Sequence, residues 1–74
     1  MNAIIYTSIG WGSCIMTKSW LRDNNIKYIE KNIEDKSNRM ELINKGYKVT
    51  PVTMVGDIAI VGFQPKKLRE VFSK

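Results

Sequence analysis

Hydrophobic residues along this chain show two kinds of spacing, which alternate from the N-terminus to the C-terminus. Short runs of apolar or β-branched residues predict strands, and apolar residues three or four positions apart predict helices. The runs predict strands over 3–7, 26–33, 52–55 and 58–61. The helical spacings cover 13–25, a segment from residue 35 or 37 to 46, and the chain from 65 onward. The predicted order is therefore β-α-β-α-β-β-α.

Residues typical of helix ends and turns set these boundaries. Asp35 or Ser37 is suited to cap the second helix, and Gly46 is suited to end it. Proline is favoured at the first position of a helix, where Pro65 stands. The residues expected to face the core are Cys14, Thr17, Leu21 and Asn24 on the first helix, Met40, Ile43 and Tyr47 on the second, and Leu68, Val71 and Phe72 on the third.

Two connections define the predicted sheet. The strand-helix-strand unit at the N-terminus requires a parallel pair with a right-handed crossover. Gly56-Asp57 predicts a two-residue turn, which makes the last two strands antiparallel. The sequence therefore predicts an α/β fold with a four-stranded mixed sheet flanked by helices. Its 74 residues fit a single domain over residues 1–74, with no linker and no internal repeat.

Composition argues against several classes of protein. Charged residues make up 26% of the chain, which leaves no stretch for a membrane span. Cys14 is the one cysteine and permits no internal disulfide, and because histidine is absent no metal site is expected. The first residues lack the basic and apolar segments of a secretory signal, so we expect a reducing, cytoplasmic location.

The net charge of +5 comes from twelve basic and seven acidic residues that are spread along the chain. The densest basic run, residues 66–69, falls on the polar side of the predicted last helix. A solvated helix face and a patch for an anionic partner both fit this run, and the even spread of charge favours the first. We expect a monomer with no nucleic acid or membrane partner.

Four local sequences stand at the joints of this element order. They are Tyr6-Thr7-Ser8 at the end of the first strand, Trp11-Gly12-Ser13-Cys14 at the start of the first helix, Val49-Thr50-Pro51-Val52 before the hairpin, and Gly56-Asp57 followed by Val61-Gly62-Phe63-Gln64-Pro65 before the last helix. In this order and at these distances they resemble the glutaredoxins and the related NrdH-type redoxins. The resemblance covers nearly the whole chain and implies a thioredoxin fold, a cis proline at Pro51 and thiol–disulfide oxidoreductase activity.

The resemblance places Trp11 at the position of the family's first, nucleophilic cysteine and Cys14 at that of the second, resolving cysteine. The distance from Tyr6 and the amphipathic helix after Cys14 both agree with the family in this register. If Cys14 were instead the first cysteine, Thr17 would stand for the second and the preceding loop would be too long.

In the family, the first cysteine lies at the N-terminus of a helix, where unpaired N–H groups and the helix dipole favour the thiolate. The thiolate attacks a disulfide, and the second cysteine resolves the mixed disulfide. Trp11 has no group that ionises near neutral pH, so it cannot act as a nucleophile. The same resemblance implies substrate contacts from Tyr6, Gly12, Ser13, Val49, Thr50, Pro51, Gly62 and Phe63.

The resemblance also implies the partners. These are disulfide-containing proteins as substrates and, as reductant, either glutathione or a thioredoxin-reductase-type enzyme, with no bound cofactor. Two departures count against glutathione. Phe63-Gln64-Pro65 follows Gly62 as in NrdH-type redoxins, which thioredoxin reductase reduces, and the family's lysine before the motif is missing because residues 8–10 are Ser-Ile-Gly.

Three hypotheses for function follow. In the first, the chain belongs to an oxidoreductase lineage in which residue 11 is altered, since a tryptophan codon differs by one base from both cysteine codons and from UGA, which can encode selenocysteine. In the second, the chain is a redox-inactive module whose groove beside Pro51 and Phe63 holds an extended peptide. In the third, Cys14 reacts as a single thiol; a buried apolar role for Cys14 is the alternative. The intact sequence around Trp11 favours the first.

Overall fold

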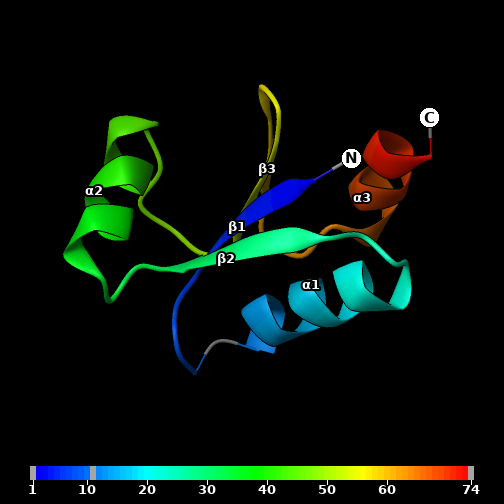
Figure 1. Cartoon of the computed structure of the whole chain (residues 1–74), viewed down its shortest axis with the longest axis horizontal. Helices are drawn as coiled ribbons and strands as arrows, with labels where there is room; N and C mark the ends of the chain where they lie inside the picture. The colour runs from blue at the N-terminus through cyan, green and yellow to red at the C-terminus, as the bar shows by residue number, and fades with distance from the viewer. Residues whose placement is uncertain (1, 11, 74) are drawn as a thin grey trace.

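A computed structural model describes residues 2–10 and 12–73 of the chain and shows the predicted element order (Figure 1). The elements are β1 (Ala3–Thr7), α1 (Gly12–Asp23), β2 (Tyr28–Asn32), α2 (Lys36–Asn44), β3 (Val52–Val55), β4 (Ile58–Val61) and α3 (Pro65–Phe72). No helix in the described part of the chain is long and apolar enough to cross a membrane.

The four strands form one mixed sheet in the order β2-β1-β3-β4. β1 pairs with β2 in parallel and with β3 antiparallel, and β3 pairs antiparallel with β4. This arrangement confirms the predicted α/β class, the parallel first unit and the hairpin at Gly56-Asp57. β2 is shorter than the predicted strand because the Ile26 N–H donates to the Leu21 carbonyl, at 2.9 Å, and so closes α1.

One face of the sheet is covered by α1 and α3. Its core consists of Ile5, Leu21, Ile60 and Leu68, all of them fully buried, one from each of two strands and two helices. The predicted stripe of α1 is confirmed at Cys14, Thr17 and Leu21, which are its buried residues. Asn24 follows the end of α1 and is exposed, so its predicted place on the stripe was wrong.

The other face of the sheet packs against α2 through a smaller core of Tyr6, Leu42 and Val52. The apolar stripe predicted for α2 was wrong at Met40 and Ile43, which are 45% and 41% exposed, but Tyr47, which follows the helix, is half-buried and packs against this core. Only Leu42 is buried among the nine residues of α2, all of which are described. Next to Leu42, Glu41 contacts Tyr6 of β1 and Lys31 of β2, so the side of α2 that faces the sheet carries one apolar and one charged residue.

The start of α2 follows from side-chain capping. Asp35 precedes the helix with extended backbone angles, and its side-chain oxygen accepts a hydrogen bond from the Ser37 N–H at 2.8 Å. An aspartate in this position satisfies one of the N–H groups that a helix leaves unpaired at its first turn. Asp35, and not Ser37, is therefore the cap.

Candidate redox site

A short loop carries the chain from the end of β1 to the start of α1. Gly10 has a φ of +86°, a conformation in which a side chain would be strained, so glycine is needed for this turn. Helix α1 begins at Gly12 and has no acidic residue in its first turn. Trp11, the predicted position of the nucleophile, lies outside the described residues. In the sequence, residue 11 directly precedes Gly12.

Cys14 is on the first turn of α1 and faces inward. Its side chain is 2% exposed, and it forms no disulfide. One turn later, the Thr17 hydroxyl donates to the carbonyl of Ser13 at 2.7 Å, and Thr17 is itself fully buried. A thiol in this position is shielded from solvent, which agrees with the burial expected at the family's second cysteine.

The segment before β3 contains a cis peptide bond between Thr50 and Pro51, as predicted. It is joined to the loop after β1 by a hydrogen bond between the hydroxyls of Ser8 and Thr50, at 2.6 Å. On its other side, the Gly62 N–H donates to the Pro51 carbonyl at 2.8 Å. Three of the sequence segments singled out above, far apart along the chain, are therefore tied together at one end of the sheet.

Comparison with known proteins decides the family. The family model described as glutaredoxin matches residues 3–60, which is well over half of the chain and includes both the helix with Cys14 and the cis proline. The chain belongs to the glutaredoxin family. Members of this family are thiol–disulfide oxidoreductases that work with disulfide substrates and reductants.

Individual relatives agree with this assignment. The glutaredoxin-like protein NrdH of Lactococcus lactis subsp. cremoris (strain MG1363) is 31% identical over 68 residues, which cover 90% of this chain and 94% of that protein. The crystal structure of the thioredoxin-like protein BC3987 is 26% identical, with a TM-score of 0.89, and covers 95% of this chain and 99% of that one. The NrdH-redoxin from Escherichia coli, at 24% identity, has the same fold, with a TM-score of 0.86 over 96% of this chain and 95% of that one.

In this glutaredoxin-family chain, a groove of about 330 Å³ lies beside the cis proline. It is lined by Ser8, Ile33, Lys48, Val49 and Thr50. Val49 and Thr50 are predicted substrate contacts, and the groove places them together. Sequence reasoning missed Ser8, Ile33 and Lys48 as lining residues. The signal for two of them was present, because Ser8 and Ile33 directly follow β1 and β2, and the carboxyl ends of neighbouring parallel strands meet at one edge of a sheet.

The other predicted substrate contacts lie outside this groove. Gly62 has a φ of +78° and is held through its N–H to Pro51. Phe63 packs partly against the core and lines a groove of about 350 Å³ with Ile15, Met16, Ser19, Trp20 and Asp23 of α1. Gly12 is exposed and Ser13 half-buried at the start of α1. The predicted contacts thus do not all meet in one groove.

The Tyr6 side chain is fully buried and presents no surface to a substrate. Its hydroxyl donates to the Glu41 carboxylate at 2.5 Å, and the Lys31 ammonium contacts the same carboxylate oxygen at 2.6 Å. Burial, together with the hydrogen bond to Glu41 and the negative charge of Glu41, raises the pKa of Tyr6 to about 12. The hydrogen bond from Lys31, followed by that from Tyr6, lowers the pKa of Glu41. This network ties α2 to β1 and β2.

We expect Tyr6→Phe to change the alkaline stability of the protein. The unfolded tyrosine ionises near its ordinary pKa of 10.0 and the folded one near 12. Between these values the folded state holds a proton that the unfolded state has lost, so the wild type loses stability as the pH rises. The stability difference between wild type and variant should therefore shrink by up to about 2 kcal/mol across this window. Urea unfolding at several alkaline pH values measures it; a constant difference would contradict the buried, hydrogen-bonded phenol.

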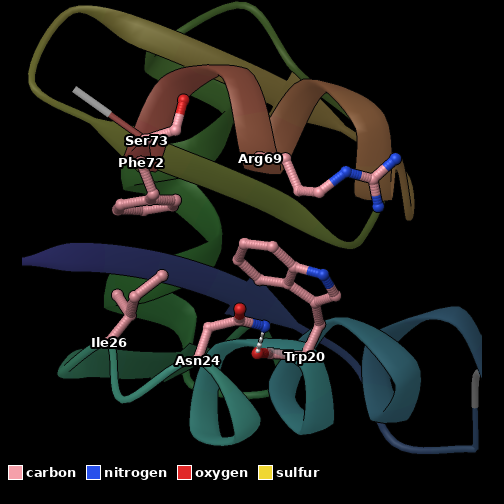
Figure 2. Close-up of a pocket in the computed structure, with 6 residues that line it drawn as sticks. All are labelled: Trp20, Asn24, Ile26, Arg69, Phe72 and Ser73. Atoms are coloured by element: carbon pink, nitrogen blue, oxygen red, sulfur yellow. Dashed lines mark hydrogen bonds between the residues drawn. The ribbon is translucent and has the colours of Figure 1, made fainter.

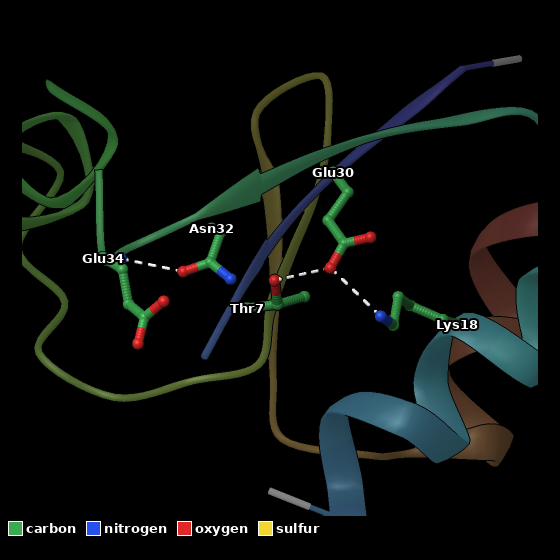
Figure 3. Close-up of polar contacts among 5 residues, drawn as sticks. All are labelled: Thr7, Lys18, Glu30, Asn32 and Glu34. Atoms are coloured by element: carbon green, nitrogen blue, oxygen red, sulfur yellow. Dashed lines mark hydrogen bonds and ion pairs between the residues drawn. The ribbon is translucent and has the colours of Figure 1, made fainter. Parts of the chain in front are cut away.

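A second polar contact lies at the other face of the same strands (Figure 3). The Thr7 hydroxyl donates to Glu30 Oε2 at 2.8 Å, and the Lys18 ammonium contacts the same oxygen at 3.0 Å. Burial raises the pKa of Glu30, but the hydrogen bonds from Thr7 and Lys18 outweigh it, and the pKa is lowered from 4.5. Thr7 ends β1, so this contact joins the strand that leads into the site to both α1 and β2.

We expect Glu30→Gln to remove a stabilising contribution that the wild type itself loses in acid. Because the folded pKa lies below the unfolded value of 4.5, the contribution is present above pH 4.5 and is lost as the pH falls through the folded pKa. At neutral pH the variant should be less stable by roughly 0.5 kcal/mol, since the pair is partly exposed. Thermal unfolding from neutral to acid pH checks this, with Glu34→Gln as control. A difference that persists in acid would count against the charge of Glu30 as the cause.

Proposed function

We propose that this chain is a redoxin whose two-cysteine cycle is interrupted at residue 11, with Cys14 in the position of the resolving thiol. The observation that supports the proposal is the pairing of a single, buried thiol with a cis proline in an otherwise complete redoxin framework. The chain has no second cysteine with which Cys14 could form an internal disulfide.

The two-cysteine cycle needs both sulfurs. In the first step a thiolate attacks one sulfur of the substrate disulfide, a new S–S bond forms, and the other substrate sulfur leaves as a thiolate. In the second step the resolving thiolate attacks the mixed disulfide, releases the reduced substrate and closes an internal disulfide. The indole of Trp11 can do neither step. Cys14 is a poor substitute for the first step because its side chain is only 2% exposed.

The proposed substrates are disulfides in extended protein segments. Val49 and Thr50 would offer their backbone beside the cis proline, and Gly12, Ser13, Gly62 and Phe63 would contact the substrate from the neighbouring segments. For the reductant we propose a thioredoxin-reductase-type enzyme over glutathione, because Phe63-Gln64-Pro65 follows Gly62 as in NrdH-type redoxins and residues 8–10 contain no lysine. The proposed location is the cytoplasm, as a monomer without a resident cofactor.

An assay of disulfide reduction by the unmodified chain tests whether the two-cysteine cycle is interrupted. We expect the wild type and Cys14→Ser to reduce a peptide disulfide at the same rate as the dithiothreitol background, because neither holds an accessible thiolate. The readout is the amount of reduced peptide over time, separated from the disulfide form by chromatography, because thiol exchange with dithiothreitol leaves the total number of thiols unchanged. Turnover by the wild type that Cys14→Ser abolishes would refute the interrupted cycle and favour single-thiol chemistry at Cys14.

A second candidate function is peptide binding without redox chemistry. The groove of about 330 Å³ beside the cis proline favours it, since Val49 at its edge is 53% exposed and available to a ligand. Titration with extended peptides that carry serine in place of cysteine tests this candidate through tryptophan fluorescence. A saturable change that Val49→Asp removes would support it, and no saturable change would exclude it.

A further inference from the structure

A groove lies at the end of α1 opposite Cys14, between the last turns of α1 and α3 (Figure 2). Its volume is about 240 Å³. Ten residues of chain separate Cys14 from Asn24 in this groove, which corresponds to about 15 Å along a helix axis. The groove is therefore distant from Cys14, and it shares Trp20 with the groove that Phe63 lines. Its lining residues are Trp20, Asn24, Ile26, Arg69, Phe72 and Ser73.

The wall of this groove is aromatic and already in place. The ring centroids of Trp20 and Phe72 are 6.2 Å apart with an angle of 38° between the planes. Both rings, together with Ile26, are half-buried and pack against the core of the α1 and α3 face. The Asn24 side-chain amide donates to the Trp20 carbonyl at 2.8 Å, which fixes the floor beneath the indole (Figure 2). An apolar ligand would meet this wall without a rearrangement of the core.

The described residues that line the groove carry a single positive charge. Arg69 is the one ionisable residue of the lining, its side chain is exposed, and it forms no ion pair within residues 2–10 and 12–73. Figure 2 shows its side chain extending from α3 on the Trp20 side of the groove. A guanidinium group offers a planar set of donors that matches a carboxylate. Among residues 2–10 and 12–73, no acidic side chain lines the groove to compete for it.

We propose that this groove binds small organic anions with a flat apolar body, and aromatic carboxylates in particular. The ring of the ligand lies against Trp20, Phe72 and Ile26, and its carboxylate pairs with Arg69. Binding requires neither Cys14 nor residue 11, so the site is independent of the redox function proposed above.

Proton–nitrogen NMR titration of the whole chain with naphthoate and its uncharged amide, naphthamide, tests the proposal. Both probes have the same ring, and only the first carries a charge. We expect naphthoate to shift the signals of Trp20, Asn24 and Ile26 and to bind about three times more tightly than naphthamide, a difference typical of one exposed ion pair.

Two variants of α3 separate this contact from the general positive charge of the chain. Arg69→Gln should abolish the preference for naphthoate and leave naphthamide binding unchanged. Lys67→Gln removes one charge from the same helix outside the groove and should keep the preference. The proposal is overturned if the shifts lie at other residues, if both probes bind alike to the wild type, or if the two variants lose the preference equally.

Discussion

Trp11→Cys should gain disulfide reductase activity of about a hundredfold or more over the wild type. Loss of a nucleophile from a catalytic unit costs several orders of magnitude in rate, so its return restores a comparable factor where the rest of the unit is present. Residue 11 directly precedes Gly12, the first residue of α1, and a thiol there is favoured as the thiolate by the unpaired N–H groups of the helix. The first turn has no acidic residue to oppose this effect.

The assay couples the variant to dithiothreitol, or to a thioredoxin reductase, and follows the reduced form of a disulfide peptide by chromatography. Trp11→Ser is the matched control, because it removes the indole without adding sulfur, and it should stay at the background rate. Mixed with the peptide disulfide and no added reductant, the double variant Trp11→Cys/Cys14→Ser should accumulate the mixed disulfide, since no second thiol of the protein resolves it. A folded Trp11→Cys protein without activity would show that the rest of the site is not competent.

Leu68→Ala should destabilise the protein by about 3 kcal/mol. Leu68 is fully buried in the core with Ile5, Leu21 and Ile60, and within α3, all of whose residues are described, it is the one buried side chain. Its truncation leaves a cavity and removes a fully buried contact between α3 and the sheet. A chain of 74 residues buries a smaller share of its surface than a larger domain, so this loss is a large part of its stability.

Urea unfolding followed by circular dichroism measures the effect as a lower midpoint at an unchanged slope. Lys67→Ala, at the exposed neighbouring position, should change the free energy of unfolding by less than about 0.5 kcal/mol. Equal effects of the two variants would contradict the assignment of Leu68 to the core.

The order of elements could be predicted from the sequence because its local signals agreed. Gly56-Asp57 between two apolar runs has few alternatives to a hairpin, and Pro65 takes the first position of α3. The inward face of α2 could not be predicted in this way. Leu42 is its one buried residue, and the Tyr6–Glu41–Lys31 contacts beside it join residues from three elements, so neither produces a periodic pattern within α2.

In the candidate site, too, local sequence predicted some features, and others depend on contacts between elements. The cis bond at Pro51 followed from a local sequence that resembles the family, and it is confirmed. The hydrogen bond between Ser8 and Thr50 and the groove that includes Ile33 and Lys48 depend on where the ends of β1 and β2 meet the segment before β3. Such positions require the sheet register, which the hydrophobic pattern of a single strand does not determine.

The intact mass of oxidised Trp11→Cys tests most directly whether residue 11 and Cys14 form one dithiol site. Two cysteines one helical turn apart at the start of a helix are close enough for a disulfide. The account predicts that mild oxidation lowers the mass by two hydrogen atoms and blocks both thiols from alkylation, and that dithiothreitol reverses the change. Two free thiols that are both alkylated after the same oxidation would contradict it.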